Sequence, residues 1–255
     1  MDIRISGSGE IAPGEYDAIH VSGSGRLHGP IRCSSLSCSG SAHGDGEIDV
    51  AERFSVSGSA HFGQDVSAGV LAVSGSGHFG QSVRAKELHA SGSFSCGGAL
   101  KCSAAEVRGA ANVGGDVEGE TVHVYGKLSC KGLVNAEEVT IRSSNPGGGD
   151  MQIGSIGGSR ISILPKSDGD GTCNDVQIGC LFGWVKTIRR GGGKPCTVRV
   201  KDAIEGDSVT LDYVTAERVS GRVVTVGGHC EIALVQYSEQ ADISPDAKVG
   251  KVEKV

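Results

Sequence analysis

Apolar residues in the first half of the chain come in pairs, and the two members of each pair are separated by a single residue. The phrase VSGSG, or a close variant of it, follows one pair in each repeat, so its first glycine marks the repeats. The marker glycines are spaced by 16 to 18 residues and are Gly7, Gly23, Gly40, Gly58, Gly75, Gly92, Gly109 and Gly126. A nearly constant spacing over so many copies indicates stacked structural repeats.

Each repeat holds three apolar pairs at fixed offsets from its marker glycine. The pairs lie four and two residues before the glycine, two and four residues after it, and eight and ten residues after it. In this alignment Glu15 falls in the column of the third pair, together with Ile31 and Ile48. Alternation with a period of two is typical of a strand. The pattern therefore predicts an all-β fold, a single-stranded parallel β-helix (solenoid), with three short strands in each triangular coil of about 17 residues.

The pattern continues beyond the eighth repeat with interruptions. Val139 and Ile141 begin a ninth coil, and we expect Met151 and Ile153 in the third pair of that coil and Ile161–Leu164 as a further strand. The predicted organisation has regular β-helix coils over 1–142, an irregular coil and inserted loop region over 143–196, closing coils over 197–237, and a polar tail over 238–255. We expect about eleven coils in all, with the tail either loose or forming a thin cap.

Composition and charge narrow the class of protein. A net charge of −6 and an isoelectric point near 5.7 argue against a nucleic-acid binder, and aromatic residues, at 4%, are too few for base-stacking platforms. The N-terminal residues show no signal-peptide pattern, and no apolar run approaches the roughly 18 residues of a membrane span. The nine cysteines suit reduced thiols. We therefore expect a cytoplasmic protein.

The repeated phrases carry a family resemblance. The VSGSG-type phrases between Ile3 and Gly126, with the closing VVTVGGHCEIALVQY at Val223–Tyr237, resemble the bactofilin-like, polymer-forming cytoskeletal proteins of bacteria. The resemblance implies a right-handed β-helix that assembles end to end into nucleotide-free filaments and serves as a scaffold at the membrane or cell wall. It implies no catalysis and no cofactor. The interruption over 143–196 departs from the family pattern.

The first coil is a candidate interface. Ile3, Ile5 and Ile11 already occupy core columns, with Met1 and Asp2 before them. The first coil of a β-helix has unpaired backbone groups and an apolar cross-section, so it needs a cap or a partner. We expect a homopolymer interface through these three isoleucines; fraying, or a crude cap from elsewhere in the chain, is the alternative.

Histidines and cysteines, which can bind metal ions, recur at fixed positions of the repeats. His43, His61 and His78 share an outward column at one-coil spacing, and imidazole is a common metal ligand. No third or fourth ligand of another kind is spaced for them, which favours a solvated ladder over a metal site. The cysteines also follow the inward columns, as Cys96 and Cys130 do, and we interpret them as core residues.

The inserted region contains the sequence CLFGWVKTIRR. Aromatic and aliphatic residues next to cations are typical of a segment that contacts a membrane surface or a protein partner. The predicted contact residues are Leu181, Phe182, Trp184, Lys186, Arg189 and Arg190. The alternative is that the apolar members fold back and plug the solenoid.

The sequence of the repeats gives little support for an enzyme. Lyases and acyltransferases built on β-helices need clustered carboxylates, a positioned histidine or aromatic residues for a sugar, and the regular coils show no such cluster in sequence. The alternative to a scaffold is a soluble, acyltransferase-like β-helical enzyme or a ligand-binding module. For the scaffold we expect self-association, a possible peripheral contact at the inner face of the membrane or with a cell-envelope protein, no nucleic acid and no small-molecule substrate.

Overall fold

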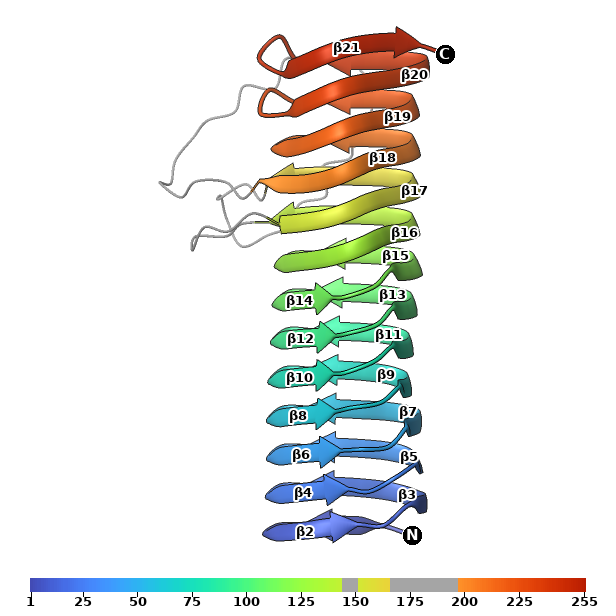
Figure 1. The fold of residues 1–255 in the computed structure, drawn as a ribbon, viewed down its shortest axis with the longest axis vertical. Coiled ribbons are helices and arrows are strands. Elements are labelled where there is room, and N and C mark those ends of the chain that lie inside the picture. Colours follow the sequence, from blue (N-terminus) through green and yellow to red (C-terminus); the bar gives the residue numbers. More distant parts are fainter. Residues whose placement is uncertain (144–150, 166–196) are drawn as a thin grey trace, which may run out of the picture.

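The structure, a computed structural model, describes residues 1–143, 151–165 and 197–255. These residues form strands and no helix, and the strands pair in parallel within one sheet (Figure 1). The strands of the N-terminal coils are β1 (Ile3–Ile5), β2 (Ser8–Ile11), β3 (Gly14–Val21), β4 (Ser24–Leu27), β5 (Ile31–Cys38), β6 (Ser41–Gly44), β7 (Ile48–Val56), β8 (Ser59–Phe62), β9 (Val66–Val73), β10 (Ser76–Phe79), β11 (Val83–Ala90), β12 (Ser93–Cys96), β13 (Leu100–Val107), β14 (Ala110–Val113) and β15 (Val117–Val124). The strands of the C-terminal coils are β16 (Lys127–Ser143), β17 (Met151–Pro165), β18 (Val198–Leu211), β19 (Val214–Val226), β20 (Glu231–Ile243) and β21 (Lys248–Lys254).

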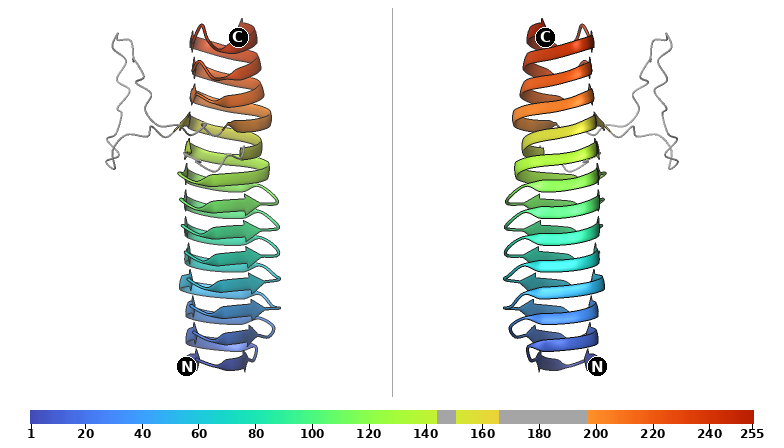
Figure 2. Two further views of the ribbon diagram at one scale, coloured as in Figure 1. Left: turned by 90° about the vertical axis from the view of Figure 1, so that its left-hand side faces the viewer. Right: turned by 90° about the vertical axis from the view of Figure 1, so that its right-hand side faces the viewer.

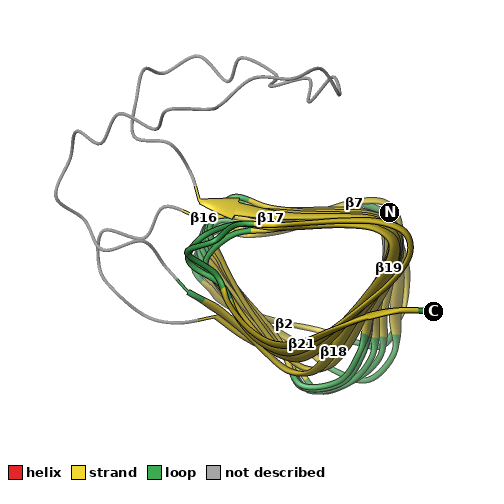
Figure 3. Ribbon diagram, turned by 90° about the horizontal axis from the view of Figure 1, so that it is seen from above, coloured by secondary structure: helices red, strands yellow, loops and turns green. Residues whose placement is uncertain are grey.

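The strands wind into a straight solenoid of about 12 turns, with coils about 17 residues apart. The two termini lie at opposite ends of the stack (Figure 2). Seen along its axis, the solenoid has a triangular outline (Figure 3). The prediction of an all-β parallel β-helix is therefore confirmed, with about one coil more than expected. The right-handed sense implied by the family resemblance stays a prediction.

The inward columns form a continuous apolar core. Ile19, Leu36 and Phe54 lie over one another in register, and each is at most 1% exposed. Four phenylalanines fill the middle of the N-terminal coils and contact one another: Phe54, Phe62, Phe79 and Phe94. Burying each such side chain contributes about 1.5–3 kcal/mol. The stacking of like columns thus supplies the main stabilisation along the axis.

The marker glycines are required by close approach between coils. A Cβ at Gly40 would overlap the carbonyl oxygen of Gly23, and the same overlap recurs in each following coil up to Gly126. That carbonyl is occupied, since Ser41 N–H donates to Gly23 O at 2.8 Å. None of these glycines has a positive φ. The glycine is therefore needed because there is no room for a side chain between the coils.

Two predicted column positions were wrong. Gly14, and not Glu15, pairs with Ile31, because the 16-residue first repeat has one residue fewer in the corner between β2 and β3, and Glu15 is exposed. Ile153 pairs with Cys130, so it belongs to the second pair of its coil and not to the third. The second error arises because β16 ends at Ser143 and β17 begins at Met151, and a count that runs on from Ser143 at constant period includes the residues between these two strands.

The predicted boundaries also shift in the C-terminal half. Residues 151–165 form the regular strand β17 within the range expected to be irregular. Residues 238–255, expected to be a loose tail or a thin cap, extend β20 to Ile243 and add β21, which pairs with β20. The solenoid therefore runs almost to the last residue of the chain.

Candidate interaction surfaces

The first coil carries the three predicted interface isoleucines. Ile11 is 2% exposed and Ile5 is 9% exposed, while Ile3 is half-buried against the core. The second coil covers them on one side only, because β1 pairs with β3 and β2 with β4 and neither has another strand partner in the described chain. At this end the backbone of β1 and β2 is therefore unpaired on one side, and Ile3 is the apolar side chain that stays partly uncovered.

The last coil is also open. The strand β21 pairs with Glu231–Tyr237, whereas the end of β20, from Gln240 to Ile243, pairs only with β19 among the described strands. Two valines at this end are exposed, Val252 by 46% and Val255 by 72%. Ile243 and Val249 pack against the core while staying half-buried. Both ends of the solenoid therefore combine incomplete strand pairing with uncovered apolar side chains.

The histidine column is a stacked ladder. The ring centroids of His43 and His61 lie 4.7 Å apart, as do those of His61 and His78, with interplanar angles of 13° and 16°. Desolvation, followed by the charges of the two neighbours, lowers the pKa of His61 below its ordinary value. Across the residues that the structure describes, no group of three or more His, Cys, Asp and Glu side chains is arranged to hold a metal ion. The described ladder is therefore a column of stacked rings and not a metal site.

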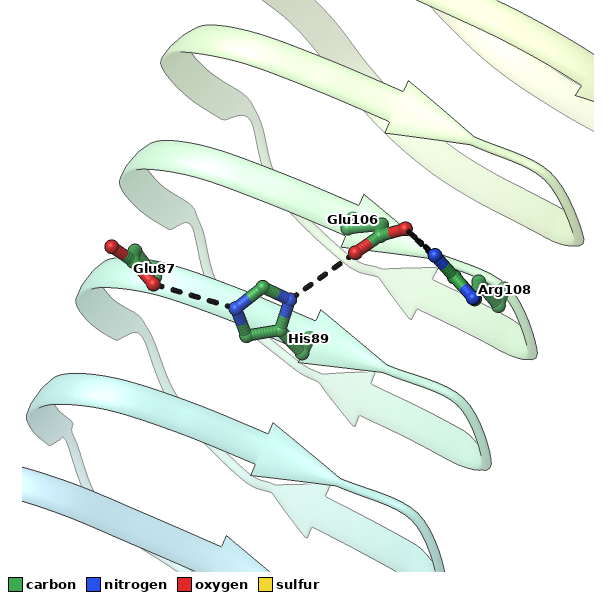
Figure 4. A network of polar contacts seen from close by, with 4 residues as sticks. All are labelled: Glu87, His89, Glu106 and Arg108. Carbon is green, nitrogen blue, oxygen red and sulfur yellow. Dashed lines mark hydrogen bonds and ion pairs between the residues drawn. The ribbon is translucent and has the colours of Figure 1, made fainter. Parts of the chain in front are cut away.

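A polar network that sequence periodicity did not single out crosses two coils (Figure 4). His89 on β11 lies between two carboxylates, with Nε2 3.4 Å from Glu87 Oε2 and Nδ1 3.4 Å from Glu106 Oε2. Arg108 holds the other oxygen of Glu106 at 2.6 Å. The hydrogen bond from Arg108 is the main cause of the lowered pKa of Glu106. A signal was present in the sequence, because His89 and Glu106 are one coil apart in one column.

A second network of the same design lies further along this face. Glu138 accepts a hydrogen bond from Arg160 Nη2 at 3.0 Å and lies 3.4 Å from His123 Nε2. The hydrogen bond from Arg160 is the largest cause of the lowered pKa of Glu138. A carboxylate with a lowered pKa stays ionised and is a poor proton donor, so both networks suit charge pairing between coils better than general acid catalysis. The side chains are partly exposed, which limits each pair to about 0–1 kcal/mol.

A groove of about 530 Å³ runs along another face of the N-terminal coils, beside Pro13, Pro30 and Glu47. Charges alternate along its side, where Arg32 lies 3.9 Å from both Glu15 and Asp49. These side chains are more than half exposed. The side of the groove is therefore a solvent-exposed strip of ion pairs.

The described cysteines are core residues, as predicted. They are free thiols and all buried: Cys33, Cys38, Cys96, Cys102, Cys130 and Cys230. Burial raises the pKa of Cys38 and of Cys96 to about 12, and that of Cys102 to about 11. Thiols with such pKa values are not reactive nucleophiles at neutral pH.

The predicted membrane or partner contact lies outside the described residues. Leu181, Phe182, Trp184, Lys186, Arg189 and Arg190 all belong to the range 166–196. The contact therefore stays a prediction. The described segments contain no helix that could cross a membrane.

Comparisons with known proteins give one partial relationship. The chain is 32% identical over 77 residues to an uncharacterized protein, YhbE, of Bacillus subtilis (strain 168). The match covers 30% of this chain and 31% of that protein, so the chain spans less than a third of its relative. No model of a protein family matches the chain, and no solved structure matches it. Membership of the bactofilin-like family stays a prediction.

Proposed function

We propose that this protein is a non-enzymatic structural scaffold, of the bactofilin-like kind, whose copies assemble end to end into polymers that need no nucleotide. The main support for the proposal comes from the two end coils of the solenoid. Both end coils have backbone groups without strand partners in the described chain, and both have uncovered apolar side chains, Ile3 at one end and Val252 at the other. An uncapped solenoid end is a template for another strand.

The flanks of the solenoid fit this role better than they fit an enzyme. The groove beside Pro13 and Glu47 is lined by exposed ion pairs. Among the groups with shifted pKa values, the buried thiols have raised pKa values and Glu106 and Glu138 have lowered ones, and neither kind suits proton transfer at neutral pH. The network around Glu106 joins neighbouring coils and would stiffen the rod. We place the assembly in the cytoplasm, with a peripheral contact at the inner face of the membrane as a further part of the proposal.

Negative-stain microscopy and sedimentation at two protein concentrations test assembly directly. We expect filaments without added nucleotide, and sedimentation that increases with concentration. Replacing Ile5→Asp places a charge at a 9% exposed position of the first coil, so it should abolish polymers while the remaining coils unfold as in the wild type. Ser57→Asp, on an exposed flank in mid-solenoid, is the control and should keep the filaments. Unchanged filaments from Ile5→Asp would remove this end from the interface, and a discrete small oligomer of the wild type would contradict the proposal.

A further inference from the structure

A second hollow lies on the flank of the solenoid, where β16, β17 and β18 turn from the second face of their coils to the third. Its volume is about 510 Å³, which is within the range of small-molecule sites. Gly154 lines the hollow together with polar side chains from three successive coils: Ser129, Lys131, Gln152, Arg199 and Lys201. Each of these polar side chains can donate a hydrogen bond.

The charge of this hollow differs from that of the groove on the N-terminal coils. Three cationic side chains line the hollow, and no described carboxylate does. The N-terminal groove, in contrast, has Glu15 and Asp49 on either side of Arg32. A chain with a net charge of −6 thus gathers three positive charges at one place, and such a concave cationic surface favours an anion.

Irregular strand pairing presents the two lysines on either side of a glycine. The register of β16 with β17 shifts after Cys130, and that of β17 with β18 shifts after Ile153. Such bulges re-aim side chains. Gly154 belongs to the coil between those of Lys131 and Lys201, and a Cβ on it would lie 2.5 Å from a backbone carbonyl oxygen of β16. The middle coil therefore leaves a gap between two lysines that are about 10 Å apart along the axis, twice the strand spacing.

Neither lysine is neutralised within the described chain. Lys131 and Lys201 are both exposed, and neither forms an ion pair with another described residue. Glu217, in the coil after that of Lys201, is not part of the lining. Two flexible ammonium groups beside the planar guanidinium of Arg199 suit a ligand that carries about two negative charges and several acceptor oxygens.

We propose that this hollow binds a phosphomonoester group, carried either by a small soluble molecule or by a lipid headgroup. A phosphomonoester has a charge of about −1.5 to −2 at neutral pH and three acceptor oxygens. Lys131 and Lys201 hold these oxygens from two sides, and Arg199 donates to them from the same coil as Lys201. The site lies on the flank of the solenoid, so it does not depend on assembly through the end coils and adds a ligand to the proposed scaffold.

Calorimetric titration of the full chain with glycerol 3-phosphate tests the soluble source. At constant ionic strength and without divalent cations, we expect one site per chain. Lys131→Gln/Lys201→Gln should weaken binding at least about tenfold, because two charge-assisted hydrogen bonds are lost. Lys86→Gln is the matched control, since Lys86 is also exposed and has no ion pair with a described residue, and it should bind as the wild type does. The urea midpoint should be the same for all three proteins.

A variant with the opposite effect and a second ligand sharpen the assignment. Glu217→Gln removes the carboxylate in the coil beside Lys201 and should tighten binding by about two- to threefold. Acetate, a monoanion, should bind at least about tenfold more weakly than glycerol 3-phosphate. Acetate binding of equal strength would overturn the assignment to a phosphomonoester.

Flotation with phosphatidylcholine vesicles, with and without phosphatidic acid, tests the lipid source. Binding that requires phosphatidic acid and is lost in Lys131→Gln/Lys201→Gln would identify a lipid headgroup as the ligand. Binding of glycerol 3-phosphate alone would identify a soluble ester. The site is overturned if the wild type binds neither probe, if the double variant binds both as the wild type does, or if Lys86→Gln loses as much affinity as the double variant.

Discussion

The corner that follows the first face of each coil is built differently in the two halves of the solenoid. In the N-terminal half, three residues centred on the marker glycine separate the last inward residue of one face from the first inward residue of the next, as residues 22–24 separate Val21 from Gly25. Each marker glycine after the first lies against the carbonyl of the glycine one coil below. Between β18 and β19, two residues make the same corner, Asp212 and Tyr213. Tyr213 has a φ of 58°, which is the left-handed region that a side chain adopts at a cost of about 1–2 kcal/mol.

Side-chain interactions hold the shorter corner in place. Asp212 Oδ1 accepts hydrogen bonds from the backbone N–H groups of Tyr213 at 3.0 Å and His229 at 3.2 Å. The rings of Tyr213 and His229 stack with centroids 4.0 Å apart and an interplanar angle of 8°. The comparison teaches that a corner can be fixed in two ways. The glycine corners lack a side chain and so allow neighbouring coils to approach closely, whereas the Asp212 corner uses side chains, both within the corner and toward His229 in the next coil.

The largest expected loss of stability follows from replacing one of the marker glycines. Gly75→Ala would drive its Cβ into the carbonyl oxygen of Gly58, so the coils must separate and the corner hydrogen bond from Ser76 N–H must lengthen. We expect a loss of about 3 kcal/mol in the free energy of unfolding, measured by urea denaturation. Gly63→Ala is the matched control, because its Cβ would lie 3.8 Å from the nearest atom. Equal stabilities for the two variants would show that close approach does not explain the ladder.

A smaller effect is expected at the C-terminal corner. Asp212→Ala removes the acceptor for two backbone N–H groups at a side chain that is only 23% exposed, which should cost about 1–2 kcal/mol in the same denaturation experiment. Asp212→Asn keeps a carbonyl oxygen at this position and should lose less than half as much. If alanine and asparagine are equally destabilising, the charge of Asp212, acting on His229, matters more than the hydrogen bonds.

The smallest expected change in stability concerns the outward column that contains the stacked histidines. In the N-terminal half this column holds like residues, His43, His61 and His78, whereas in the last coils it ends with Glu231 and Lys248, which are of opposite charge. The pKa of His61 is lowered in the folded state, so the unfolded chain binds a proton more readily. Stability is then complete above the unfolded pKa of about 6.5 and falls as the pH drops through the lower folded value.

Urea denaturation at pH 7.5 and pH 5.5 measures this effect. The urea midpoint should fall on acidification by more in the wild type than in His61→Gln, which cannot acquire the central charge between His43 and His78. Arg26 below the ladder and Ser95 above it are the neighbouring residues in the column and are unchanged in the variant. An identical pH dependence of the two proteins would show that the stacked rings accommodate their charges without cost.

The sequence predicted the regular coils well and their irregular parts poorly. The columns through Leu71 and Phe79 follow from alternation and a constant period, because each coil repeats the same packing problem. The displacement of Glu15 and of Ile153 could not be foreseen, since a shortened first repeat and the residues before Met151 change the count without changing the local pattern. The networks around Glu106 and Glu138 were missed for a related reason, because the contacts of His89 with Glu106 and of Arg160 with Glu138 form only when coils stack.

The sequence by itself determined the fold class, the period and the glycine corners of this protein, because all three follow from side-chain size and polarity within one coil. Tertiary structure decided which residues stand over one another after the interruptions, and with them the identity of the two ends. The register depends on how each insertion is accommodated at a corner, and a single residue gained or lost there exchanges inward and outward positions. The contacts of His89 with Glu106 and of Arg160 with Glu138 could therefore be recognised only in the complete stack.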